Sequence, residues 1–86
     1  MKVVLYICSE REVETPIPRH YLPPISLCRE LGMRDLDEIA QHLPHVLLEE
    51  LRRRGEIRVT DYNVIEKIAG EFEKPGYLRI VAVKLS

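Results

Sequence analysis

The chain has 86 residues, with 13 lysines and arginines against 14 aspartates and glutamates, so its formal net charge is −1. This near-neutral balance excludes a polycationic packaging protein and an acidic disordered tail. Apolar residues make up 45% and charged residues 31%, a mixture that folds. We therefore expect one small globular domain over residues 1–86.

Two features of the sequence bear on location. The longest apolar run, Val3 to Cys8, is far shorter than the roughly 20 residues that cross a bilayer. A single lysine before that run is too little charge for a secretory signal. Gln41 and Asn63 are the only side-chain amides, and few amides beside many charged residues are typical of a thermophile. We expect a cytoplasmic protein of thermophilic composition with no membrane partner.

Three runs of residues predict strands. Residues 2–8 are continuously apolar after Lys2, which indicates a central strand buried on both faces. Residues 56–60 alternate apolar and polar side chains. Residues 77–85 are nearly all apolar, and we place this last strand beside the first. Residues 9–24 contain four of the six prolines, which favours a Pro-rich surface loop.

Helices are predicted over residues 25–31, 35–43, 44–54 and 61–72. Gly32 supplies a stop for the first, and Asp35 with Glu38 resembles a capping box at the start of the second. Pro44 divides an apolar stripe whose phase continues across it, so helices 35–43 and 44–54 are expected to be collinear or slightly bent. Thr60 or Asp61 caps the last helix. The stripe consists of Leu36, Ile39, Ala40, Leu43, Val46, Leu47 and Leu51.

These elements predict an α/β (α+β) two-layer fold, in which a small sheet of about three strands is packed by helices. Such a sheet has two edges, and 86 residues bury a limited core. Both features favour a homo-oligomer, with a dimer as the first guess.

The chain has two cysteines, Cys8 and Cys28. In a cytosol, two reduced, buried thiols are the first expectation and a disulfide the second, because intracellular proteins of hyperthermophiles do form disulfides. A bond between these residues would close a loop of about 20 residues and stabilise the fold by roughly 3 kcal/mol. No CxxC pair is present, so the spacing predicts neither a zinc ribbon nor a thioredoxin-like site.

A metal-ligand pattern also occurs in the helical region. Glu38, His42, His45 and Glu49 follow the spacing i, i+4, i+7, i+11, which puts imidazoles and carboxylates on one face of a continuous helix. That face lies opposite the apolar stripe, where solvated residues belong, and this favours a surface role. We predict no cofactor and no catalytic residue, and an enzyme is the less favoured class.

The second half of the chain is basic. Residues 1–51 have a net charge of −4 and residues 52–86 of +3. Arg52, Arg53 and Arg54 are consecutive and Arg58 follows, a cluster that could contact nucleic-acid phosphates. The structural alternative is that arginines at a helix C-terminus offset the macrodipole, with Arg54 paired to Glu50.

Residues 47–69 run helix, glycine, short strand, second helix, and in this order they resemble the opening of a winged-helix domain. The recognition helix that such domains place next is missing, because a Pro-Gly turn and an apolar strand follow. No family assignment follows from this resemblance.

The favoured hypothesis is therefore a small non-enzymatic protein that acts through self-association and protein contacts. The alternative is a nucleic-acid-binding accessory or regulatory protein that uses Arg52, Arg53, Arg54 and Arg58. A metal- or thiol-dependent site is the third.

Overall fold

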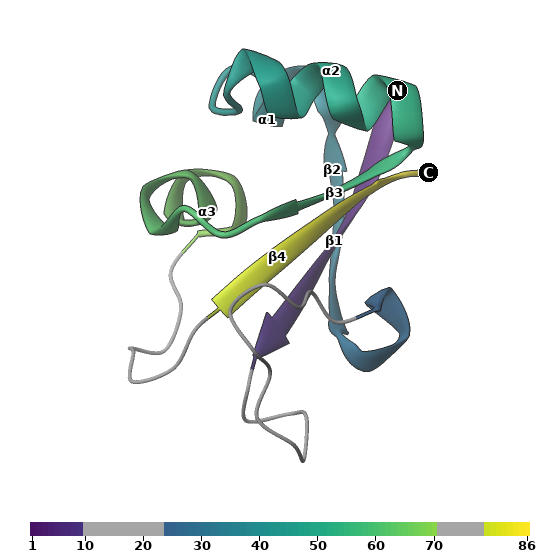
Figure 1. Ribbon diagram of the computed structural model, residues 1–86, viewed down its shortest axis with the longest axis vertical. Coiled ribbons are helices and arrows are strands. Elements are labelled where there is room, and N and C mark those ends of the chain that lie inside the picture. The colour runs from purple at the N-terminus through teal and green to yellow at the C-terminus, as the bar shows by residue number, and fades with distance from the viewer. Residues whose placement is uncertain (10–23, 71–78) are drawn as a thin grey trace.

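The computed structural model describes residues 1–9, 24–70 and 79–86, which form a four-stranded antiparallel sheet with helices on one side (Figure 1). The sheet order is β2-β1-β4-β3. The two-layer α+β fold is thus confirmed, with one strand more than the three predicted. Along the chain the elements are β1 (Lys2–Ser9), the 3-10 turn η2 (Ile25–Leu27), β2 (Arg29–Asp35), α1 (Leu36–Ala40), α2 (His45–Arg54), β3 (Glu56–Val59), α3 (Tyr62–Ala69) and β4 (Arg79–Leu85).

The first strand is central, as its unbroken apolar run predicted. β1 pairs with β2 on one side and with β4 on the other, where Val3 lies opposite Leu85. The placement of the last strand beside the first is confirmed for residues 79–85; residues 77 and 78 lie outside the described part, as do residues 10–23 of the predicted Pro-rich loop.

The main core lies between the sheet and the three α-helices. Alternate residues of the strands point into it, because successive side chains of a strand face opposite sides of the sheet. Buried side chains of the three helices pack against these strand residues. Its buried members are Val3, Leu5, Leu36, Ile39, Leu43, Leu51, Ile57, Val59, Ile65, Ile68, Val81 and Val83.

The opposite face of the sheet carries no α-helix of the described chain, and we call it the helix-free face. A second, smaller cluster lies there, made of buried Cys8, Ile80 and Ala82. Ile25 and Cys28 pack against it. Figure 1 shows η2 on the side of the strands away from α1, α2 and α3.

The helix predicted over residues 25–31 is wrong beyond Leu27. Residues 29–35 form the edge strand β2, in which Lys2 lies opposite Asp35 and Ile7 opposite Arg29. Gly32 does not stop a helix; it lies inside the strand with φ 138°, next to an irregularity in the pairing with β1. The open side of β1 offers a hydrogen-bonding partner, and that tertiary pairing outweighs the local helix preference of Leu, Glu, Met and Arg.

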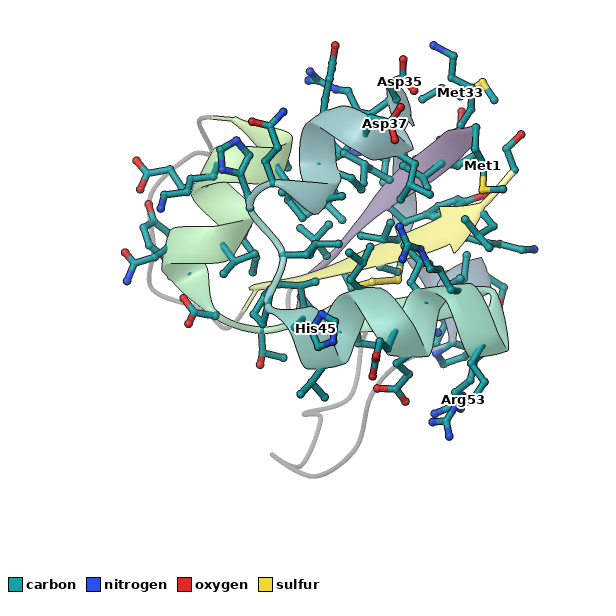
Figure 2. All side chains as sticks on the ribbon, turned by 90° about the horizontal axis from the view of Figure 1, so that it is seen from above. Met1, Met33, Asp35, Asp37, His45 and Arg53 are labelled. Carbon is teal, nitrogen blue, oxygen red and sulfur yellow. A yellow bond between two sulfur atoms is a disulfide. The ribbon has the colours of Figure 1, made fainter. Side chains whose placement is uncertain are left out.

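The helices around Pro44 are also different from the prediction. Pro44 has an extended backbone (ψ 146°) and precedes α2 as its N-cap, so the chain turns over residues 41–44. In Figure 2, α2 runs from His45 back toward Arg53, opposite in direction to α1, which begins beside Asp37. The two helices are therefore not collinear.

Because of this turn, the residues of α2 that face the core are not all the ones that the predicted apolar stripe places inside. Val46, expected inside, is 73% exposed, while Leu48 packs against the core. The capping box is likewise absent: the Asp35 side chain makes no cap hydrogen bond and lies 3.8 Å from the Lys2 ammonium.

The start of α3 agrees with the sequence. The Asp61 carboxylate accepts hydrogen bonds from the backbone N–H of Asn63 at 2.9 Å and of Val64 at 3.4 Å. The helix ends at Ala69, with Gly70 as its C-cap, earlier than the predicted residue 72. Residues 71 and 72 lie outside the described residues.

Replacing Asp61 with alanine should lower the free energy of unfolding by about 1 kcal/mol, because two N–H groups of the first turn of α3 lose their acceptor. The matched control is Asp35→Ala, since Asp35 is the N-cap residue of α1 and its side chain accepts no cap hydrogen bond. Urea unfolding followed by circular dichroism measures both. Equal stability of the two variants would contradict a capping role for Asp61.

Candidate interaction surface

Cross-strand neighbours form two rows on the helix-free face. Val4 and Tyr6 belong to this face, because Val3 and Leu5 face the main core and side chains alternate. Directly opposed residues of antiparallel strands lie on the same face. The register therefore places the side chains in one row as Met33, Val4, Lys84 and Glu56, and in the next as Glu30, Tyr6, Ala82 and Arg58.

The first row is open to solvent. Met33 is 57% exposed, Lys84 is exposed, and Val4 is half-buried beside them. Leu31, at the pairing irregularity of the same edge strand, is also exposed. We call Val4, Leu31 and Met33 the β2 patch.

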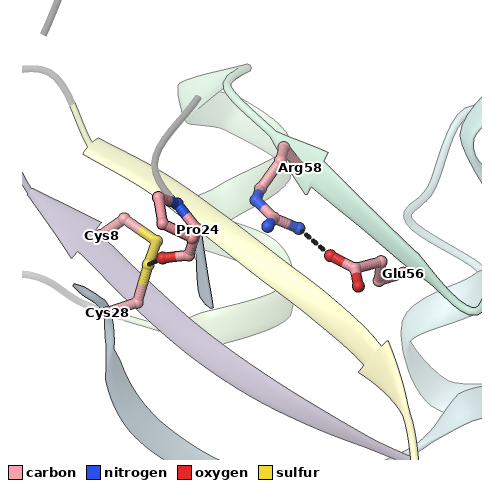
Figure 3. Close-up of a disulfide and its surroundings, with 5 residues drawn as sticks. All are labelled: Cys8, Pro24, Cys28, Glu56 and Arg58. Atoms are coloured by element: carbon pink, nitrogen blue, oxygen red, sulfur yellow. Dashed lines mark hydrogen bonds and ion pairs between the residues drawn. A yellow bond between two sulfur atoms is a disulfide. The ribbon is translucent and has the colours of Figure 1, made fainter. Parts of the chain in front are cut away.

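The second row is covered except at Glu30, which is exposed. Ala82 is fully buried and Tyr6 half-buried within the smaller cluster. The Arg58 side chain is 14% exposed, and its Nη1 lies 2.7 Å from Glu56 Oε2. Figure 3 shows the disulfide on the β1 side of β4 and this ion pair on the β3 side.

Four of the six exposed large apolar side chains of the described chain lie on β2 or near its ends, and the other two lie on α2 and α3. Leu31 and Met33 lie on it, and Leu27 lies just before it. Met1 lies at its far end, where the Met1 carbonyl accepts a hydrogen bond of 2.9 Å from Leu36 N–H. Figure 2 shows Met1 and Met33 at the same end of the molecule, away from His45.

The structure divides the four predicted arginines into two pairs. Arg52 and Arg53 are exposed on the last turn of α2, and no ion pair joins either to a carboxylate of the described residues. Arg54 Nη1 lies 2.8 Å from Glu50 Oε1, the pairing anticipated from the sequence. Arg58 is paired with Glu56 on β3, so the cluster does not form one continuous basic surface.

The two paired arginines share a shallow hollow with their carboxylate partners. It lies between the end of α2 and the edge strand β3 and is lined by Glu50, Arg54, Glu56, Ile57 and Arg58. Equal numbers of opposite charges line it, so its field attracts neither anions nor cations strongly.

The four candidate metal ligands are spread over two helices and a turn. Glu38 lies in α1, exposed His42 in the turn, and His45 with Glu49 in α2. His45 Nε2 is 3.0 Å from Glu49 Oε1, an exposed i,i+4 pair. Within residues 1–9, 24–70 and 79–86, no group of three or more His, Cys, Asp or Glu side chains is placed to hold a metal ion.

The two cysteines are joined in a disulfide, so the first expectation of reduced thiols is not what the structure holds. Their Cα atoms are 4.5 Å apart, the spacing of a non-hydrogen-bonded antiparallel pair. The bond therefore continues the β1–β2 pairing one position past Ile7 and Arg29. The Pro24 carbonyl oxygen lies 3.6 Å from Cys28 Sγ, a contact only, since a disulfide sulfur has no proton to donate.

The β2 patch was not found by sequence reasoning. Its signal is weak, because Leu31 and Met33 are separated by a glycine and flanked by charged residues that fit a helix equally well. Only the pairing of residues 29–35 with β1 shows that these side chains lie on an edge strand.

Comparisons with protein-family models, with curated proteins and with solved structures found no match to this chain. No helix of the described residues is long and apolar enough to span a membrane.

Proposed function

We propose that this protein is a small, non-enzymatic, cytoplasmic interaction module that self-associates through the β2 patch, with a second copy of the chain as the occupant. The observation that carries the proposal is the gathering of exposed apolar side chains on and beside one edge strand. Such gatherings typically mark interaction sites, whereas isolated exposed apolar residues do not.

The charges around the patch support a second copy as the partner. Lys2 and Asp35 form an exposed pair of opposite sign at one end of β1 and β2, and Glu30 and Arg34 add one charge of each sign on β2. With Lys84 beside Val4, the rim carries charges of both signs, which can meet the opposite charges of a second copy. The small main core supports association further, since burying more apolar surface stabilises a domain of this size.

Met33→Lys tests the proposal. This variant should weaken dimerisation at least tenfold, about 1.4 kcal/mol, because a charge is placed where an apolar side chain would be buried between copies. Sedimentation equilibrium over a range of concentrations measures the dissociation constant.

The matched control for this experiment is Val46→Lys, which removes an exposed apolar side chain from α2 and makes the same change in charge. It should leave the dissociation constant unchanged. A monomeric wild-type protein at millimolar concentration, or equal weakening by both variants, would refute association through the β2 patch.

A second candidate function is nucleic-acid binding through Arg52 and Arg53. The observation in its favour is that both guanidinium groups are exposed at the end of α2, with no ion pair to a described carboxylate. Two exposed cations side by side can contact phosphates, and the affinity would then fall steeply with salt.

Fluorescence anisotropy with mixed-sequence DNA and RNA at about 50 and 200 mM salt tests this candidate. The double variant Arg52→Glu/Arg53→Glu should abolish binding, while Lys67→Glu/Lys84→Glu makes the same charge change elsewhere and should retain most of it. If wild-type protein does not bind at the lower salt, or if both double variants bind equally weakly, the arginines have no specific role.

A further inference from the structure

The pairing between β1 and β2 is divided into a long and a short part. Residues 2–5 pair in one register with residues 32–35. The register then shifts between Leu5 and Tyr6, and only Tyr6 and Ile7 continue, opposite Glu30 and Arg29. A bulge of this kind interrupts the ladder, so the short part receives little support from the long part. The Cys8–Cys28 disulfide closes the free end of the short part.

The segment next to that disulfide covers part of the helix-free face. Ile25 and Cys28 pack against Cys8, Ile80 and Ala82, and the last two are almost fully buried although no α-helix of the described chain lies over them. Tyr6 completes the same cluster. Removal of the segment would therefore expose apolar surface in the row next to Val4 and Met33.

Among the described residues, the backbone hydrogen bonds of residues 24–28 outside the strand pairing stay within that segment. Leu27 N–H donates to Pro24 O at 3.0 Å and Cys28 N–H to Ile25 O at 2.9 Å. Among the described residues, the covalent link from this segment to another strand is the disulfide to Cys8. The disulfide can therefore control whether this segment stays packed on the sheet.

We propose that the Cys8–Cys28 disulfide is a redox-controlled clasp. When it is reduced, residues 24–30 separate from β1, and Tyr6, Ile80 and Ala82 become part of the surface that includes the β2 patch. The separation itself is independent of the proposed self-association; only its effect on dimerisation depends on that function.

The reductant belongs to the class of dithiols, small molecules or protein dithiols. Its thiolate attacks Cys28 Sγ, because Cys28 is partly exposed whereas Cys8 is buried. The Cys8–Cys28 bond breaks, Cys8 leaves as a thiolate and takes up a proton. The second thiol of the reductant then displaces Cys28, so two electrons pass to the protein and the dithiol becomes a disulfide.

The main core and the other strand pairings lie apart from the disulfide and from the segment that it holds. The main core on the helix side contains neither cysteine and shares no buried member with the smaller cluster. The long part of the β1–β2 pairing and the β1–β4 pairing also lie outside the segment that is released. Reduction should therefore open one end of β2 in a protein that stays folded.

Residue-resolved amide hydrogen exchange of the oxidised protein and of the protein in dithiothreitol tests the clasp. On reduction, exchange at Ile7 and Arg29, the hydrogen-bonded pair next to the disulfide, should accelerate at least about tenfold more than exchange at Val81 to Val83, which responds only to the loss of global stability. The variant Cys8→Ala/Cys28→Ala, without reductant, should reproduce the reduced pattern. An equal change at Arg29 and at Val81 to Val83 would refute the proposal, because reduction would then act only through the global stability of the fold.

Sedimentation equilibrium of the same samples separates this inference from the proposed function. Reduction should tighten dimerisation severalfold, and Met33→Lys should remove the gain. If local exchange accelerates but the dissociation constant does not change, the clasp does not control association, although association through the β2 patch in the oxidised protein still stands. If the oxidised and reduced proteins are both monomeric, the proposed function fails while the exchange result still decides the clasp.

Discussion

Replacing Leu51 with alanine should lower the free energy of unfolding by about 3 kcal/mol. Leu51 is fully buried in α2, where it joins the main core between helices and sheet. The substitution removes buried apolar surface and leaves a cavity that a close-packed core fills only in part. A domain of this size has a total stability of about 5 to 10 kcal/mol, so the loss would be a large fraction of it.

The control for this prediction lies on the same helix. Val46→Ala shortens a side chain that is 73% exposed, so its effect should stay within about 0.5 kcal/mol. Urea unfolding followed by circular dichroism measures both variants. Similar stability of Leu51→Ala and Val46→Ala would contradict the orientation of α2, because it would mean that both side chains face solvent.

Reduction of the disulfide should lower the free energy of unfolding by about 3 kcal/mol. Twenty positions in the chain separate the two cysteines, and a link of that span restricts the unfolded chain considerably. Urea unfolding with and without dithiothreitol gives the difference. A change below about 1 kcal/mol would show that the link does little to limit the unfolded ensemble.

The two large effects should add. Leu51 belongs to the main core and the disulfide to the smaller cluster on the opposite face, and neither contributes a buried residue to the other. Contributions from separate sites are additive within about 0.5 kcal/mol. Leu51→Ala in the reduced protein should therefore lose about 6 kcal/mol, and a markedly different sum would show that the two faces of the sheet are coupled through β1.

Local signals in the sequence were sufficient for several elements. The apolar run of β1 predicted a central strand, and the run before the C-terminus predicted its neighbour β4. Asp61 was one of two predicted caps for α3, and α2 ends at Arg54, the predicted last residue, with Gly55 at φ 85° as its C-cap. These features depend on residues adjacent in the chain, and so periodicity and capping rules identify them.

The wrong predictions fall where residues distant in the sequence determine the local structure. Residues 29–35 have the composition of a helix, yet they form β2 because β1 presents an unpaired edge to them. Pro44 was expected to divide two collinear or slightly bent helices, and it instead precedes a second helix that runs back over the sheet. Val46 therefore faces solvent instead of the core, because the reversal of the chain gives α2 an apolar face of its own.

The sequence by itself thus determined the α+β class, the central pair of strands and the last helix, because each follows from runs of neighbouring residues. The tertiary structure alone decided that Cys8 meets Cys28 and that Met33 lies on an exposed edge. Each of these depends on which strand lies next to which. Side-chain pattern within one segment does not contain that information, since the hydrogen-bonding groups that join strands are the same in every residue except proline.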